Sequence, residues 1–175
     1  TNCAPRRLTS RSDGFELFPS WSRDGSRIVY VRWTDEGLGE IRTMNANGGG
    51  DRAVTTRPGH YRRPAFSPDG RTIVYEAGEG GFLTSPEYSG QSGIYMIPAA
   101  GGEAVRLTDS GNSPHFGAGN DRIFMTTSAE DKQRLVSVDR TGGDERVHAS
   151  GELVTHYMVA PDGENFLFQQ DYNGF

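Results

Sequence analysis

The chain of 175 residues carries 18 basic and 23 acidic residues, giving a formal net charge of -5. This acidic balance argues against a nucleic-acid partner, which favours a basic face. Only 34% of the residues are hydrophobic, and no stretch reaches the roughly 18 apolar residues that a membrane-spanning helix needs. The 24 glycines and 9 prolines are typical of a turn-rich protein built from many short strands.

One stretch of sequence recurs along the chain. The segment FPSWSRDGSRIVY at 18–30 returns as RPAFSPDGRTIVY at 63–75, and in weaker form at 113–125 and 156–168. A period in this range indicates a repeat architecture. The aligned anchor residues, spaced by 45, 50 and 43 residues, are Trp21, Phe66, Phe116 and Val159.

Each unit begins with a first strand that ends at its anchor residue, and the anchor Phe66 is expected to be buried. A tight turn follows at 22–25, 67–70 and 160–163, where Asp can bond its own backbone and Gly accepts a positive φ. The third unit departs from this pattern, with Gly-Ala-Gly-Asn at 117–120. We assign the turn aspartates to structure, because catalysis needs one pair of carboxylates in one place. They are Asp24, Asp69 and Asp162.

Three more strands complete the unit. The second strands are expected at 28–30, 73–75, 123–125 and 166–168, the third at 41–44, 94–97 and 135–138, and the fourth at 53–55, 105–108 and 146–148. Loops of variable length separate the second and third strands, including 77–93 and 128–133. No helix is expected. Four short antiparallel strands in about 45 residues form one blade of a β-propeller, so the sequence predicts an all-β propeller.

The repeat carries a family resemblance. The phrase Pro-x-(Trp/Phe)-Ser-x-Asp-Gly-x-x-Ile-Val-Tyr, followed by an apolar strand, Gly-Gly and Arg-Leu-Thr, resembles the TolB-type propeller repeat. This WD-like repeat occurs in TolB and in propellers attached to bacterial amidohydrolases and to prolyl-oligopeptidase-type and tricorn-type peptidases.

The chain is expected to be a single propeller segment over 1–175 that forms a partial ring. Full blades are expected at 16–55, 61–108 and 112–148, a partial blade at 154–175, and the outer strand of a preceding or closing blade at 6–9. Two geometries stay open, a closed ring of about four blades or a piece of a larger ring, about six blades by resemblance to TolB. A cut ring exposes apolar blade faces, through which we expect self-association.

The sequence predicts no catalytic residue, no metal site and no cofactor. Gly-x-Ser-x-Gly, His-x-His and His-Glu-x-x-His are all missing. One alternative rests on resemblance to oligogalacturonate lyases, in which channel histidines of a propeller act with a metal. His115 and His156 fall in first strands, which line the channel of a propeller, and His60 lies just before one.

Candidate binding residues gather where the first strands begin, at the rim of the channel. Tyr61, Arg62 and Arg63 form a basic and aromatic cluster that can hold an acidic group or a partner peptide. The complete set of predicted binding residues is His60, Tyr61, Arg62, Arg63, Asn112, His115 and His156.

The sequence therefore favours a non-catalytic module for protein or peptide interaction, part of a larger exported bacterial protein. The alternative is the accessory propeller of a hydrolase, of amidohydrolase or peptidase type, whose catalytic domain lies outside this chain. A propeller lyase that uses channel histidines is the weaker alternative. Resemblance to TolB implies a periplasmic location.

Overall fold

The computed structural model describes residues 4–78, 91–152 and 154–170. Its regular structure is entirely β-strand, and the described part contains no helix that could cross a membrane. The strands form three antiparallel sheets of four strands and one pair, named blades 1 to 4 here. The prediction of an all-β fold with four-stranded antiparallel blades is confirmed.

Each blade is a meander in which consecutive strands pair. Blade 1 contains β1 (Phe15–Trp21), β2 (Arg27–Thr34), β3 (Leu38–Asn45) and β4 (Arg52–Ala53). Blade 2 contains β5 (Tyr61–Phe66), β6 (Thr72–Ala77), β7 (Gly93–Pro98) and β8 (Val105–Thr108). Blade 3 contains β9 (Asn112–Phe116), β10 (Arg122–Ala129), β11 (Lys132–Asp139) and β12 (Arg146–Gly151). Blade 4 contains β13 (Val154–Val159) and β14 (Phe166–Gln170).

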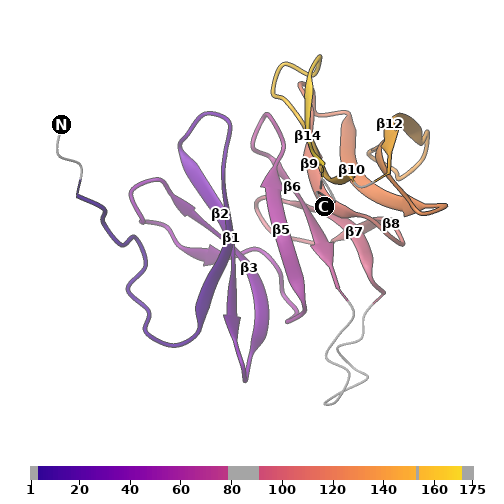
Figure 1. Cartoon of the computed structure of the whole chain (residues 1–175). Coiled ribbons are helices and arrows are strands. Elements are labelled where there is room, and N and C mark those ends of the chain that lie inside the picture. The colour runs from indigo at the N-terminus through magenta and orange to yellow at the C-terminus, as the bar shows by residue number, and fades with distance from the viewer. Residues whose placement is uncertain (1–3, 79–90, 153, 171–175) are drawn as a thin grey trace, which may run out of the picture.

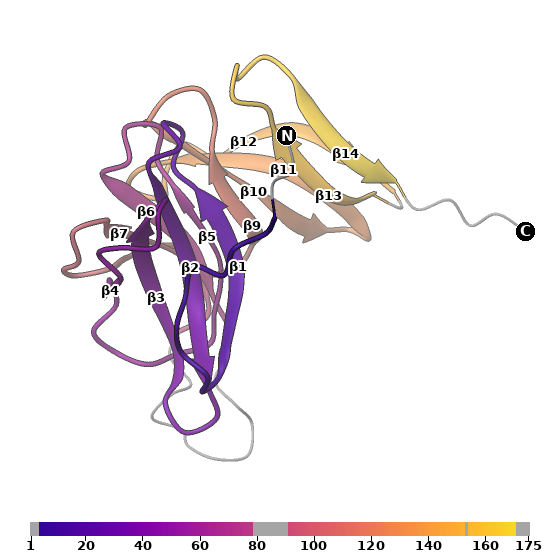
Figure 2. The ribbon, with the colours of Figure 1, turned by 90° about the vertical axis from the view of Figure 1, so that its left-hand side faces the viewer.

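The blades stand side by side as sectors of an open ring (Figure 1). Figure 2 views the molecule from the side of blade 1 and shows β13 and β14 away from that blade. The first strands contact one another in succession, β1 with β5, β5 with β9, and β9 with β13, and are therefore the inner strands. The fold is a partial β-propeller.

The inner strands have two distinct ends. The β1–β2, β5–β6 and β9–β10 turns lie at one end, which we name the turn end. The opposite end carries the β2–β3 hairpin and the connections between blades, and we name it the loop end. Tyr61 pairs with Ala77 near the loop end, whereas Phe66 pairs with Ile73 near the turn end.

Apolar side chains fill the space between neighbouring blades. Successive residues of a strand point to opposite faces, so each blade buries one face against each neighbour. Blades 1 and 2 share a core that includes Val29, Val31, Ile41, Phe66, Ile73 and Tyr75. Blades 2 and 3 share Val74, Ile94, Leu107, Phe116, Ile123, Met125, Val136 and Val138. Blades 3 and 4 share Leu135, Tyr157 and Val159.

The anchor of blade 1 differs from the other three anchors in its exposure, and the expected burial of Phe66 is confirmed. Phe66, Phe116 and Val159 are at most 8% exposed, but Trp21 is 57% exposed. Trp21 pairs with Ile28 on the face of blade 1 that is turned away from blade 2. In the described structure no blade covers that face, so the aromatic ring remains in solvent.

The segment before blade 1 lies against that same outer face. Leu8 packs against Ile28, Tyr30 and Met44. Residues 4–12 form no regular strand in the structure, so the assignment of 6–9 to a further blade stays a prediction. On blade 4 the outward-facing Leu167 is 73% exposed.

The prediction of a loop at 128–133 is wrong. β10 continues to Ala129 and β11 begins at Lys132, which leaves a two-residue turn. Both turn residues, Glu130 and Asp131, have positive φ, of 52° and 59°, as a type I′ hairpin turn requires. The Gly-rich loop expected at 77–93 falls largely on 79–90, outside the described residues.

Candidate functional site

The inner strands β1, β5 and β9 each contain a residue with positive φ at which the strand pairing is irregular. Phe18, Arg63 and Ser113 have φ of 52°, 45° and 54°, and the strand pairing shifts register around each of them. Positive φ is uncommon for residues that carry a side chain, and a β-bulge re-aims the side chain at its position. The Arg63 guanidinium carbon lies 5.9 Å from the centre of the Phe18 ring. The bulges of blades 1 and 2 thus bring two side chains together.

Arg62 and Arg63 share one buried acid. An Arg63 Nη1 atom lies 3.1 Å from Glu76 Oε2, and an Arg62 Nη1 atom lies 3.5 Å from Glu76 Oε1. The Glu76 side chain is 8% exposed, whereas the Arg62 and Arg63 side chains are 52% and 40% exposed. One carboxylate balances one guanidinium, so the cluster keeps a net positive charge at the surface. Arg62, Arg63, Glu76 and Phe18 are named the arginine cluster.

Two members of the arginine cluster were absent from the sequence prediction. Glu76 follows Ile73-Val74-Tyr75 in an apolar second strand, and a charged residue at such a position was the signal that could have found it. Phe18 lies in the neighbouring blade, and its approach to Arg63 depends on how the blades pack.

His115 joins blade 3 to blade 4. Its Nε2 accepts a hydrogen bond from the Val159 backbone N–H at 2.9 Å, so its proton resides on Nδ1, which donates to the Ser113 carbonyl at 2.9 Å. Burial lowers the pKa of His115, which agrees with a neutral ring. Because both ring nitrogens are engaged, His115 acts as a structural link, and a role as a metal ligand would break one of these bonds.

His60 and Tyr61 belong to a groove between blades 1 and 2 rather than to the arginine cluster. The His60 ring lies against Trp33 of blade 1, with ring centres 4.9 Å apart. The Tyr61 hydroxyl donates to the Arg57 carbonyl at 3.0 Å, and burial raises the pKa of Tyr61. The predicted rim residues therefore divide between two surfaces of blade 2.

Asn112 is not among the residues of either surface. Asn112 is exposed at the start of β9. The backbone of His156 pairs with Gln169 in blade 4, and its side chain lies outside the described part of the chain. Within the described ranges, no three His, Cys, Asp or Glu side chains gather in a group that could hold a metal ion.

The side chain of Arg23 links blade 1 to blade 3 at the turn end. Arg23 donates to the Gly117 carbonyl at 2.7 Å and to the Ala118 carbonyl at 2.9 Å, both in the β9–β10 turn of blade 3. In the same turn, the Asn120 side-chain oxygen accepts a hydrogen bond from the Asp69 backbone N–H of blade 2 at 3.1 Å. The turn whose sequence departs from the repeat therefore ties three blades together.

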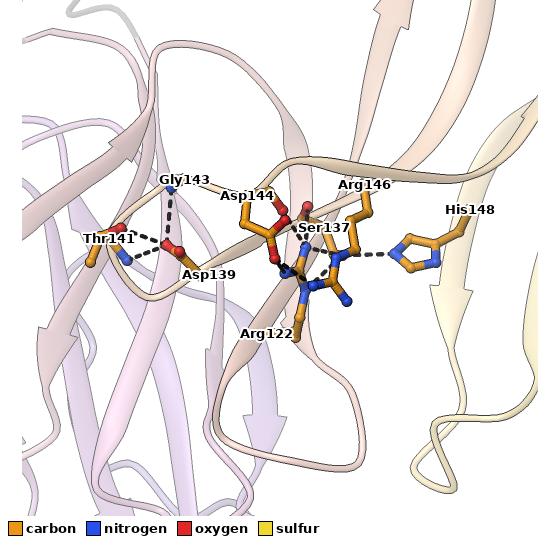
Figure 3. A network of polar contacts seen from close by, with 8 residues as sticks. All are labelled: Arg122, Ser137, Asp139, Thr141, Gly143, Asp144, Arg146 and His148. Carbon is orange, nitrogen blue, oxygen red and sulfur yellow. Dashed lines mark hydrogen bonds and ion pairs between the residues drawn. The ribbon is translucent and has the colours of Figure 1, made fainter.

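Blade 3 contains a polar network that sequence reasoning missed (Figure 3). Arg122 donates to the Ser137 hydroxyl oxygen at 3.0 Å from Nε and at 2.9 Å from Nη2. The hydroxyl proton of Ser137 is then free to bond His148 Nε2, which lies 2.7 Å away. Asp144 pairs with both Arg122 and Arg146 at 2.6 Å. No single motif signals this network, because its members come from three strands and one turn.

The Ser137–His148 contact has the spacing of a nucleophile and its base, but its surroundings are structural. Ser137 is fully buried, so no substrate reaches its oxygen. Asp144 bonds the arginines instead of orienting His148, and hydrogen bonds from Arg146 and Arg122 lower the pKa of Asp144. Burial and the charges of Arg122 and Arg146 lower the pKa of His148. The network fastens β10, β11 and β12 to one another.

Comparison with known proteins places this geometry in a family. The family model described as the TolB beta propeller domain matches residues 2–175. The chain belongs to the TolB beta propeller family. A relative within it, the Tol-Pal system protein TolB of Francisella tularensis subsp. holarctica (strain OSU18), is 33% identical over 90 residues, which are 51% of this chain. The aligned region spans 19% of that relative's length, about a fifth.

Solved structures share the fold of this TolB-type propeller. TolB from Acinetobacter baumannii superposes with a TM-score of 0.76 at 20% identity, over 96% of this chain and 40% of that one. The tricorn protease gives a TM-score of 0.66 at 13% identity, over 93% of this chain and 21% of that one. These likenesses show the fold, which occurs both in TolB and in a protease.

Proposed function

We propose that the chain is a non-catalytic interaction module that binds a protein or peptide partner through the arginine cluster. The observation that carries the proposal is the pairing of two partly exposed guanidiniums, Arg62 and Arg63, with the single buried carboxylate of Glu76. The excess positive charge is suited to the acidic side chains of a partner.

The cluster is prepared for binding by its surroundings. Glu76 holds both guanidiniums from beneath, and the Phe18 ring lies beside that of Arg63. Little side-chain freedom remains to be lost when a partner binds, and this favours affinity. At the opposite end of the inner strands, the turn end, Arg23 links blade 1 to blade 3. We therefore expect the partner to bind from the loop end.

The proposal is tested with an array of synthetic peptides that differ only in their number of Glu and Asp residues. We expect the chain to bind the acidic members, and the double variant Arg62→Gln/Arg63→Gln to lose at least fivefold in signal, since a hydrogen bond to a charged group contributes about 1.5–3 kcal/mol. Arg71→Gln is the matched control, because Arg71 is an exposed arginine of the same blade near its turn end. Equal losses in the control and the double variant, or no dependence on acidic residues, contradict the proposal.

The second candidate is the accessory propeller of a hydrolase whose catalytic domain lies outside this chain. The fold likeness to the tricorn protease favours it. The mass of the native gene product and a search of its full sequence for a catalytic domain separate the two candidates. A native product without a hydrolase domain excludes the second.

We further propose that the module belongs to a larger exported bacterial protein and acts in the periplasm, on the strength of its likeness to TolB. Cell fractionation with an antibody against the chain tests the location, and recovery with the cytoplasmic fraction contradicts it. The exposed Trp21 and Leu167 on the outer faces of blades 1 and 4 support self-association of the isolated chain. If the chain stays monomeric at all concentrations in analytical ultracentrifugation, the proposed self-association is contradicted.

A further inference from the structure

A groove opens between blades 1 and 2, and the proposed function does not use it. Its volume is about 660 Å³. One wall is the connection from blade 1 to blade 2, including Arg57 and Pro58, and the floor comes from Tyr61, Tyr75 and Tyr95 on three adjacent strands of blade 2. We name it the tyrosine groove.

The groove arises from the short outer strand of blade 1. β4 has two residues, whereas β8 has four and β12 has six. After Val54 enters the core, the chain leaves the sheet and crosses to β5. A bridge between Gly39 and Gly59 fixes this crossing. Blade 1 therefore covers this face of blade 2 only in part, and the groove lies over the part that stays uncovered.

The three tyrosines form a rigid surface. The Tyr61 and Tyr75 rings meet edge to face with centres 5.3 Å apart, and the Tyr75 and Tyr95 rings stack with centres 5.7 Å apart. The hydroxyl groups of Tyr61 and Tyr95 already donate to backbone carbonyls, those of Arg57 at 3.0 Å and Gln91 at 2.6 Å. Two of the rings are thus held in place by their own hydrogen bonds.

Tyr75 has a hydroxyl group that is still available. The residue is 3% exposed, yet it lines the groove, and its hydroxyl bonds no residue in the described ranges. At the aligned position of blade 1, the hydroxyl of Tyr30 donates to Asp51 at 2.8 Å. Burial raises the pKa of Tyr75, so its hydroxyl stays protonated and is a donor at neutral pH. The Tyr75 hydroxyl is not among the fully buried unpartnered side-chain atoms, so it reaches the space of the groove, where a ligand carbonyl can accept its hydrogen bond.

We propose that the tyrosine groove binds a proline-containing peptide segment in the polyproline II conformation, with one peptide carbonyl accepting a hydrogen bond from Tyr75. Polyproline II has no internal hydrogen bonds, so its carbonyls are free, and proline rings pack on aromatic surfaces. Strands lie about 4.8 Å apart, so three tyrosines on adjacent strands extend over roughly 10 Å. One polyproline II turn of three residues, about 9 Å long, matches that length.

The charges along the groove give the peptide a direction. Arg57 lies beside Tyr61 at the inner strand, and Glu103 lies just before the outer strand β8. Neither side chain forms an ion pair with another described residue. A basic peptide residue fits at Glu103, and a carboxylate fits at Arg57.

The probe is a peptide of one lysine followed by five prolines with a free carboxyl terminus, labelled with fluorescein on its α-amino group. Fluorescence anisotropy with the full chain is expected to show saturable binding. A control peptide in which glycine and serine replace the prolines is expected to bind at least tenfold more weakly. Tyr75→Phe removes only the free hydroxyl and should weaken probe binding about fivefold to tenfold, and Tyr95→Ala should weaken it further.

Controls separate this site from the arginine cluster. Tyr157→Phe, a matched loss of a buried tyrosine hydroxyl in blade 4, should leave binding unchanged. Arg62→Gln/Arg63→Gln should also leave it unchanged, so this proposal and the proposed function can fail separately. Equal binding of both peptides overturns the proposal, as does an affinity that Tyr75→Phe does not alter. Binding of a neutral oligosaccharide in place of the proline probe, lost with Tyr75→Phe, also overturns it.

Discussion

Two residues at the same position of successive repeats provide the sharpest test of the blade packing. Phe66 of blade 2 and Trp21 of blade 1 are aligned anchors that end their inner strands. Phe66 is 8% exposed, whereas Trp21 is 57% exposed. We expect Phe66→Ala to destabilise the fold strongly and Trp21→Ala to have a small effect.

The magnitudes follow from the surroundings of each ring. Phe66 packs in the core between blades 1 and 2, and the Arg27 guanidinium carbon of blade 1 lies 4.8 Å from its ring centre. Truncation of a buried phenylalanine to alanine costs about 3–5 kcal/mol, and loss of the cation–π contact adds about 0.5–1 kcal/mol. Trp21 keeps more than half of its surface in solvent, so its truncation costs less than about 1.5 kcal/mol.

The measurement is urea denaturation followed by far-UV circular dichroism, since loss of Trp21 would distort a tryptophan fluorescence signal. The free energies of unfolding of the two variants should differ by at least about 2 kcal/mol. Equal destabilisation by both substitutions would refute the assignment of Trp21 to an uncovered blade face. A Phe66→Ala variant as stable as the wild type would refute the core between blades 1 and 2.

Three further predictions use the same denaturation assay. Tyr75→Phe should change the free energy of unfolding by less than about 0.5 kcal/mol, whereas Tyr30→Phe removes a bond to Asp51 and should cost about 1–3 kcal/mol. Burial lowers the pKa of His115 below its usual 6.5, so the unfolded chain takes up a proton first, and stability should fall as the pH drops below 6.5, less so in His115→Gln. Gly142→Ala should destabilise more than Gly25→Ala: both have positive φ, but a Cβ at 142 overlaps the Leu107 carbonyl and one at 25 meets nothing.

The architecture could be predicted because each repeat contains, within its own sequence, the residues that form its strands and turns. In the first turn, Asp24 accepts hydrogen bonds from the Ser26 backbone N–H and from the Ser22 hydroxyl, as its turn chemistry predicts. These bonds lower the pKa of Asp24 to about 2, although its carboxylate is exposed. The expected second and third strands also appear, since alternating apolar residues such as Ile73 and Tyr75 must face a neighbouring blade.

The contacts between blades were beyond sequence reasoning because their partners are far apart in the chain. Arg23 and the Gly117 carbonyl are 94 residues apart, and His115 and the Val159 N–H are 44 residues apart. Neither partner is visible as a motif, since each acceptor or donor is a backbone group. The exposure of Trp21 is not readable from the sequence for a related reason: its repeat position is identical to that of Phe66, and only the neighbouring blade decides whether the ring is buried.

Function in a repeat fold depends on where the repeats stop being equivalent. Blade 2 carries Tyr61-Arg62-Arg63 where blade 1 carries Glu16-Leu17-Phe18, although the bulge at the third position is the same. Tyr75 and Tyr30 are the same residue at the same position, but among the described residues a carboxylate bonds the hydroxyl of Tyr30 and none bonds that of Tyr75. The shared features account for packing between blades, and the differences concentrate charge and a free donor on blade 2. Both surfaces proposed for binding therefore lie on this blade, and variants at its loop end are expected to alter binding while leaving the interblade core intact.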